Sequence, residues 1–285
     1  VTPISAHPAF AKAAHLLGLE HVTTPLDDDF RANVPAWLSE LRDDTVLTMG
    51  SAYSYPHGVI DPIAAMADAA GERDIPFHTD ACIGGFVLPF LDELGVSVPG
   101  WDFRVPGVTQ ISADVHKYGY ATKGASVITY RDRADLRAQI FTYHEWPGGM
   151  YRTPGVAGAR AASPIAAAWA VMNYLGRAGY ATLVADLQAT TERFATGIAA
   201  TPGLRVLGAP IGPLLAFTSD SVDINAVGDV LDDCGWGLGR VHDPDGLQMM
   251  IAPHHRGVVD EFLSDLADAV AHPVATPRTA RGYNT

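Results

Sequence analysis

The sequence predicts an α/β protein with a mostly parallel, mixed sheet, followed by a small C-terminal α+β domain. Short apolar strands alternate with helical segments up to about residue 130, which is typical of βαβ units. Long alanine-rich helical patterns begin at Gly158, and short strands and helices follow Pro202 and Gly203. We therefore divide the chain into a large domain over residues 1–157, connecting helices over 158–200 and an α+β domain over 201–285.

The large domain is expected to begin with a helix that opens at Pro8 and ends at Gly18. Pro8 suits the first helical turn, and Gly18 suits the left-handed C-cap after an apolar-periodic run. Asp61 and Pro62 form a typical N-cap and N1 pair for a later helix. The elements expected after residue 18 are strand 19–25, helix 34–41, strand 45–50, helix 61–71, strand 76–80, helix 86–94, and strands 108–113 and 125–130.

The remainder of the chain changes character, because two long helices without intervening strands precede the last domain. The helices are expected over residues 161–175 and 180–200. The elements expected after them are strands 204–207 and 214–218, helix 224–234, strands 236–241 and 248–252, and a closing helix 258–270.

Composition excludes several classes of function. A formal net charge of −13 over 285 residues argues against a nucleic-acid partner. No apolar run is long enough to span a membrane, and two distant cysteines, Cys82 and Cys234, indicate a reducing compartment. We predict a cytoplasmic location. The acidic run 27–29 is typical of a solvated turn, so we assign no metal site.

Lys117 is the most informative single residue. It follows an apolar strand and His116, and it precedes Tyr118, Gly119 and Tyr120, neighbours that suit a closed pocket. A desolvated lysine in such a pocket can act as a nucleophile. Alternatively, Lys117 ends the strand and extends to solvent. Residues 111–120 alone leave both interpretations open.

Asp80 gives a second reason to expect a site at this edge of the sheet. Asp80, Lys117 and the loop 53–55 each follow a predicted strand, and ligands of parallel sheets bind at the carboxyl ends of the strands. A buried carboxylate needs a cation or several donors, and a protonated pyridine nitrogen is one such cation. An aspartate paired with a Schiff-base lysine is the usual protein contribution to pyridoxal phosphate chemistry. Alone, Asp80 would rather be an N-cap.

Several long segments, in the same order, resemble the sphingosine-1-phosphate lyases. These enzymes belong to the group II pyridoxal-phosphate-dependent decarboxylases, which have the aspartate-aminotransferase fold, also called fold type I. The resemblance is strong up to Met172 and weaker in the C-terminal domain. The matching segments are residues 6–14, 55–62, 78–86, 103–109, 111–120 and 148–151.

The resemblance implies a role for each of eight residues. Lys117 matches the lysine that bonds to the cofactor, Asp80 the partner of its pyridine nitrogen, and His7 the histidine stacked on its ring. His116 matches a contact to the cofactor phosphate. Lys123 matches a lysine of the substrate-phosphate pocket, with Tyr55 close by. His78 and Thr79 would line the cofactor cleft, and a homodimer would complete the site.

We therefore expect pyridoxal 5'-phosphate as cofactor and a phosphorylated amine as substrate. The expected reaction is a carbon–carbon lyase step that converts a phosphorylated long-chain base to a fatty aldehyde and phosphoethanolamine. Alternatives are an L-amino-acid decarboxylase for glutamate, aspartate or an aromatic acid, and an inactive truncated fragment. The family has a loop for the cofactor phosphate before the stacking histidine, and none precedes His7. We expect the chain to lack that N-terminal part of the large domain.

Overall fold

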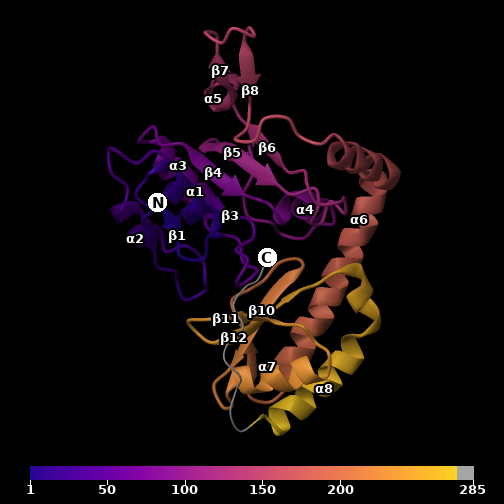
Figure 1. The fold of residues 1–285 in the computed structure, drawn as a ribbon. Helices are drawn as coiled ribbons and strands as arrows, with labels where there is room; N and C mark the ends of the chain where they lie inside the picture. Colours follow the sequence, from indigo (N-terminus) through magenta and orange to yellow (C-terminus); the bar gives the residue numbers. More distant parts are fainter. Residues whose placement is uncertain (275–285) are drawn as a thin grey trace.

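The four-stranded sheet of the first half has the predicted mixed topology (Figure 1). The computed structural model describes residues 1–274. The strand order is β3-β4-β5-β6; the first three strands run parallel and β6 pairs antiparallel with β5. The prediction for β5 is confirmed to the residue, and the other three begin one to three residues later than expected. The strands are β3 Thr48–Ser51, β4 Phe77–Asp80, β5 Val108–Ala113 and β6 Val127–Tyr130.

Short helices accompany this sheet much as the sequence predicts. The first helix, α1, ends at Gly18, whose φ of 67° is the left-handed conformation expected of its C-cap. The expected strand 19–25 shrinks to two residues, β2, which pair with an unforeseen strand β1. The expected helix 86–94 is divided between η1 and α4. The bounds are β1 Thr2–Pro3, α1 Ala9–Leu17, β2 Thr23–Thr24, α2 Val34–Ser39, α3 Ile63–Gly71, η1 Gly84–Phe86 and α4 Leu88–Glu93.

Asp61 does not cap helix α3, contrary to the prediction. Its Oδ1 accepts a hydrogen bond from the Ala32 backbone N–H at 2.8 Å, and its Oδ2 accepts one from the Ser51 N–H at 2.7 Å. The side chain is fully buried, and this burial raises its pKa to about 6 against the two hydrogen bonds, which lower it. Asp61 therefore ties the end of β3 to a distant loop instead of starting a helix.

A small arm after β6 was not predicted. It consists of helix α5 (Arg133–Gln139) and the antiparallel strands β7 (Phe141–Tyr143) and β8 (Tyr151–Thr153). In Figure 1 the arm projects from the body of the molecule, and most of its side chains are exposed. Each of these strands has only three residues, so neither presents an alternation long enough to be recognised.

The two long helices expected after Gly158 are joined in a single element, α6 (Ser163–Ala200), which is kinked part of the way along. Gly176 interrupts the helix with φ 57° and ψ −177°, close to the gap predicted between residues 175 and 180. Helix α6 runs from the first sheet to the second (Figure 1). The Tyr180 hydroxyl donates to the Gly119 carbonyl at 2.8 Å and so fixes α6 beside the loop that carries Lys117.

A second, antiparallel sheet, in the order β11-β12-β10-β9, forms the C-terminal part, as expected for an α+β unit. Helix α7 packs on β12, and α8 packs against α7 and α6 (Figure 1). One continuous hydrophobic core includes Phe77 of the first sheet and Leu214 of the second. Residues 275–285 of the predicted domain lie outside the described part. The bounds are β9 Leu204–Val206, β10 Leu214–Ser219, α7 Ile224–Asp233, β11 Gly239–Val241, β12 Gly246–Met250, η2 Pro253–Gly257 and α8 Val259–Ala271.

Within residues 1–274, no helix combines the length and the apolar character needed to cross a bilayer.

Candidate active site

Asp80 is the last residue of β4 and stands at the carboxyl edge of the first sheet. The parallel pairing of β4 with β5 places it opposite Ser112. Its Oδ1 accepts hydrogen bonds from the Cys82 N–H at 3.1 Å and the Ser112 hydroxyl at 3.3 Å. Among the described residues none donates a hydrogen bond to Oδ2, although Asp80 is only 9% exposed. The carboxylate is thus held in place with one oxygen available to a ligand.

His78 lies two residues earlier on the same face of β4 and continues the polar network. Its Nε2 is 3.0 Å from the Ser112 hydroxyl, and its Nδ1 is 3.4 Å from the Gln110 side-chain oxygen. Phe10 of α1 packs edge-on against the imidazole, with 5.6 Å between ring centroids. Burial is the main cause that lowers the pKa of His78, so the ring is neutral near pH 7.

Thr79, expected to line the cofactor cleft, points the other way. Successive side chains of a strand alternate between its two faces, so Thr79 lies on the face of β4 opposite to the one that bears His78 and Asp80. Its side chain is fully buried, and its hydroxyl has no hydrogen-bond partner among residues 1–274. The structure therefore does not bring Thr79 to the face of the sheet that bears Asp80.

Lys117 follows β5 and forms an ion pair with Asp114. The distance from Nζ to Asp114 Oδ2 is 3.0 Å, and the lysine side chain is 28% exposed. Burial lowers the pKa of Lys117, but the Asp114 hydrogen bond and the charges of Asp114, Cys82 and Asp80 raise it, and the net result lies above the usual value. Lys117 is therefore partly buried and near Asp80, as expected, but it is an ammonium held by a carboxylate.

His116 and Lys123 occupy the loop beyond β5. The His116 Nδ1 donates to the Ala125 carbonyl at 3.0 Å, while its Nε2 lies 3.8 Å from Asp114 Oδ2. Lys123 is exposed and forms no ion pair within residues 1–274. Lys123 can therefore bind an anion without losing an ion pair among the described residues, and His116 would lose only its 3.8 Å contact with Asp114.

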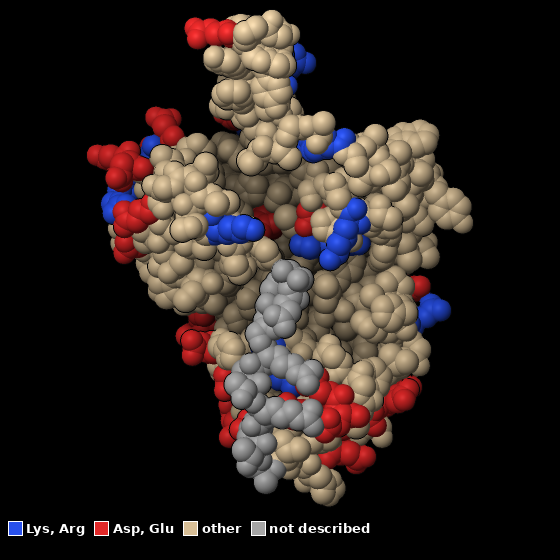
Figure 2. Space-filling model, viewed as in Figure 1, with Lys and Arg blue, Asp and Glu red and all other residues tan. Residues whose placement is uncertain are grey.

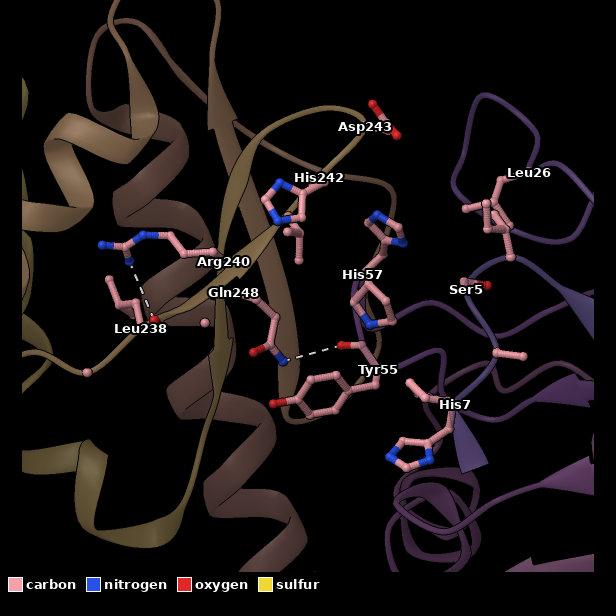
Figure 3. A pocket seen from close by; sticks show the side chains of 17 residues that line it. Ser5, His7, Leu26, Tyr55, His57, Leu238, Arg240, His242, Asp243 and Gln248 are labelled. Atoms are coloured by element: carbon pink, nitrogen blue, oxygen red, sulfur yellow. Dashed lines mark hydrogen bonds between the residues drawn. The ribbon is translucent and has the colours of Figure 1, made fainter. Parts of the chain in front are cut away.

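His7 and Tyr55 line a cavity of about 660 Å³ between the first half of the chain and the β11–β12 hairpin (Figure 3). The His7 Nδ1 accepts the Ala9 N–H at 3.2 Å, so the imidazole also caps α1. The Tyr55 carbonyl accepts a hydrogen bond from the Gln248 side chain at 3.3 Å. Neither Lys117 nor Asp80 lines this cavity. The predicted residues therefore form two groups, one at the sheet edge and one at the cavity.

The residues at the sheet edge fit the pyridoxal phosphate that the resemblance implies. A free oxygen of a fixed buried carboxylate can accept the N–H of a protonated pyridine, and a nearby primary amine can bond to an aldehyde. Figure 2 shows that this face of the molecule is hollowed, with acidic and basic side chains inside the hollow.

Two residues of this network were not singled out from the sequence. Ser112 connects Asp80 to His78, and Asp114 holds Lys117. The signal for Ser112 is its position on β5 opposite Asp80, which requires the strand register. The signal for Asp114 is its spacing of three residues from Lys117, which suits an ion pair in a turn.

Comparisons with known proteins identify the family and the fold. The model of the pyridoxal-dependent decarboxylase conserved domain matches residues 1–219. A sphingosine-1-phosphate lyase of Arabidopsis thaliana is 40% identical over 99% of this chain and 52% of its own length. A solved sphingosine-1-phosphate lyase of Burkholderia pseudomallei has a TM-score of 0.92 and 42% identity, over 95% of this chain and 62% of that one. The glutamate decarboxylase of Lactobacillus brevis, 20% identical with a TM-score of 0.82 over 98% of this chain and 67% of that one, shares the fold. The chain spans about half the length of the curated relatives it matches.

Replacing Asp114 with asparagine should lower the pKa of Lys117. The substitution removes the charge that raises this pKa and leaves the burial that lowers it. We expect the pH of half-maximal acetylation of Lys117, followed by mass spectrometry of its peptide, to fall. The exposed Lys123 in the same digest serves as control and should keep its profile. An unchanged profile at Lys117 would contradict the ion pair.

Proposed function

Since the chain belongs to the pyridoxal-dependent decarboxylase family, we propose that it carries the lysine and aspartate of a carbon–carbon lyase that cleaves a phosphorylated long-chain base to a fatty aldehyde and phosphoethanolamine. The observation that carries this proposal is the pair of Asp80 and Lys117 at the ends of adjacent parallel strands. The identity of 42% to a sphingosine-1-phosphate lyase, against 20% to a glutamate decarboxylase, favours the lyase over the decarboxylase.

Asp80 would hold the proton on the pyridine nitrogen of the cofactor. Pyridoxal phosphate, when bound, withdraws electrons from the substrate α-carbon, and this withdrawal is strongest when its ring nitrogen is protonated. The Oδ2 of Asp80 is the acceptor for that N–H, because Oδ1 is already occupied by Cys82 and Ser112. The network through Ser112 to His78 keeps the carboxylate from turning away.

Lys117 would bond to the cofactor aldehyde through Nζ and later release it to the substrate amine. An ammonium cannot attack a carbonyl carbon, so Lys117 must first lose a proton. Asp114 Oδ2 at 3.0 Å holds the ammonium in position until that proton leaves. His7 would cover the cofactor ring, and the Nε2 of His116 would approach its phosphate.

Lys123 and Tyr55 would bind the phosphate of the substrate. Lys123 is an exposed cation without an ion pair among the described residues, so a phosphate dianion would meet it at little cost. In the reaction a base takes the proton from the hydroxyl at C3, the oxygen forms the aldehyde, and the Cα–Cβ bond breaks with its electron pair left on Cα. A proton then returns to Cα.

We propose further that the active form is a homodimer in which the arm formed by α5, β7 and β8 covers the second copy. The arm has exposed apolar side chains that suit such a contact: Phe141 is 58% exposed, Trp146 54% and Met150 62%.

The free thiols Cys82 and Cys234 support a cytoplasmic location.

The lyase proposal predicts turnover of sphinganine 1-phosphate. The protein, produced with any flanking sequence that its gene supplies and with pyridoxal phosphate added, should release the C16 aldehyde and phosphoethanolamine. Replacing Lys117 with alanine should reduce the rate at least about 10³-fold, because no other amine lies in its place. Absence of aldehyde together with rapid release of carbon dioxide from an amino acid would instead establish a decarboxylase, and inactivity toward both would favour the inactive fragment.

Lys123 separates the two enzymes further. Replacing it with alanine should raise KM for sphinganine 1-phosphate about tenfold or more and leave the visible spectrum of the bound cofactor unchanged. Arg205, an exposed arginine of β9, offers a control: its replacement by alanine should leave KM unchanged. Equal KM values for the Lys123 variant and the parent would contradict a phosphate contact.

If the protein is a homodimer, size-exclusion chromatography with light scattering should give a molar mass near twice that of the chain. Replacing Phe141 and Trp146 together with aspartate should yield the monomer mass, because charges would enter the apolar contact. The exposed Leu16, replaced with aspartate, is the matched control and should leave the dimer intact. A parent protein that is monomeric at micromolar concentration would contradict the proposal.

A further inference from the structure

The ammonium of Lys117 must lose a proton before it can attack an aldehyde, and a carboxylate and an imidazole lie close to it. Asp114 Oδ2 is 3.0 Å from the Lys117 Nζ, and the same oxygen is 3.8 Å from the Nε2 of His116. One carboxylate oxygen is therefore shared by an ammonium and an imidazole nitrogen. The three side chains are between 13% and 28% exposed, so they are largely shielded from bulk water.

The far side of the His116 ring determines which of its nitrogens carries a hydrogen. Nδ1 lies 3.0 Å from the Ala125 carbonyl, and because a carbonyl oxygen only accepts, Nδ1 is the donor. In the neutral imidazole, Nε2 then has a lone pair near the carboxylate oxygen of Asp114. Their separation of 3.8 Å is longer than a hydrogen bond, as expected for two acceptors. A proton on Nε2 would turn this contact into a charge-assisted hydrogen bond.

Asp114 is held as an ionised carboxylate. Its Oδ1 accepts a hydrogen bond from the Ser126 hydroxyl, so Oδ2 remains for Lys117 and His116. Burial raises the pKa of Asp114, but the hydrogen bonds from Ser126 and Lys117 outweigh it, and the net result lies below the usual value. A carboxylate of low pKa does not retain a proton, and an imidazole is ordinarily the stronger base. Asp114 is thus suited to pass a proton on.

The backbone holds these side chains in one turn. The Asp114 N–H donates to the Cys82 carbonyl at 3.1 Å, and the Lys117 N–H donates to the Asp114 carbonyl at 3.2 Å. A Cβ at Gly119 would come within 2.5 Å of the Val115 carbonyl oxygen, so this close approach requires glycine. The carboxylate, the imidazole and the ammonium are therefore in place before a cofactor binds.

Two other groups influence the charge of Lys117, and neither suits the role of acceptor. They are Cys82 and Asp80. Burial raises the pKa of the Cys82 thiol, so its sulfur already carries a proton near pH 7. The free oxygen of Asp80 is the one that the proposed function assigns to the pyridine nitrogen.

We propose that Asp114 passes to His116 the proton that Lys117 loses when it bonds to the cofactor. The lone pair of the neutral Nζ forms the bond to the aldehyde carbon as the carbon–oxygen bond breaks. The two hydrogens that remain on Nζ leave with the oxygen as water, and the third stays on Nε2 of His116 as a proton. The inference rests on the proposed function, in which Lys117 bonds to the cofactor, and it gives His116 a role besides contact with phosphate.

The test uses pyridoxal, which has the aldehyde of the cofactor but no phosphate. The protein without cofactor is mixed with pyridoxal at several pH values and reduced with borohydride after different times, and mass spectrometry measures the label on Lys117. The rate constant of the parent should be nearly flat between about pH 7 and pH 9, because an ordinary ammonium stays protonated and an ordinary imidazole stays neutral there.

The decisive variant is His116→Asn, which keeps a side-chain donor for the Ala125 carbonyl and removes the second ring nitrogen. Its rate constant should fall about 100-fold near pH 7 and then rise about tenfold per pH unit, because the proton must leave to water. His15→Asn changes an exposed histidine of α1 and should keep the parent profile. Ser126→Ala removes an exposed donor to Asp114 with little risk to folding, and it should lower the rate about threefold without changing the flat profile.

Nitrogen-15 NMR of the histidine-labelled protein without cofactor tests the arrangement directly, even where a variant fails to fold. The neutral ring of His116 should carry its hydrogen on Nδ1, and a hydrogen on Nε2 instead would overturn the proposal. A parent rate that rises with pH as steeply as that of His116→Asn would overturn it too. Equal pyridoxal rates in parent and variant, with weaker binding of pyridoxal phosphate by the variant, would make His116 a phosphate contact only.

The position of the label distinguishes this proposal from the function on which it rests. A label on Lys117 that forms equally fast in the parent and in His116→Asn would uphold the proposed function and overturn the proton transfer. A label confined to other lysines, or none at all, would overturn the proposed function itself.

Discussion

The candidate site depends on the register between β4 and β5. Parallel pairing sets Asp80 opposite Ser112, and the chain then needs only a short turn to bring Lys117 back toward the same edge. A slip of one residue would turn Asp80 to the opposite face, because strand side chains alternate. The apolar residues of both strands, Phe77 and Val108 among them, are fully buried and make such a slip expensive. The hydrophobic core thus fixes the polar geometry above it.

Hydrogen bonds and an ion pair hold the charged side chains of the site in fixed positions. Asp80 has one oxygen committed to two donors, and Lys117 is bound to Asp114. This arrangement is preorganised for a group that brings a proton to Asp80 and an aldehyde to Lys117. The ion pair with Asp114 also means that burial alone does not make Lys117 nucleophilic. The proton must leave at the moment of bonding.

Local signals in the sequence predict most elements of the fold, and they fail where tertiary contacts decide. The strand of residues 108–113 and the C-cap at Gly18 follow from apolar runs and from glycine's freedom at positive φ. Asp61 has the sequence signature of an N-cap, yet two backbone donors from distant segments take its carboxylate. Sequence reasoning placed Asp80 and Lys117 at one edge, because strand ends are local features. It could not find the partner Ser112, because that contact depends on the register between β4 and β5. The direction of Thr79 and the spacing between Asp114 and Lys117 are local features, and they acquire a meaning only once the face that bears Asp80 is known.

The proposed function depends on Lys117 as the residue that bonds to pyridoxal phosphate. The most direct measurement is to reduce the cofactor-loaded protein with borohydride, digest it and locate the phosphopyridoxyl label by mass spectrometry. We expect one stoichiometric label, on Lys117, and its loss in the Lys117→Ala variant. A label confined to other lysines, or none in a protein that retains the cofactor, would contradict it.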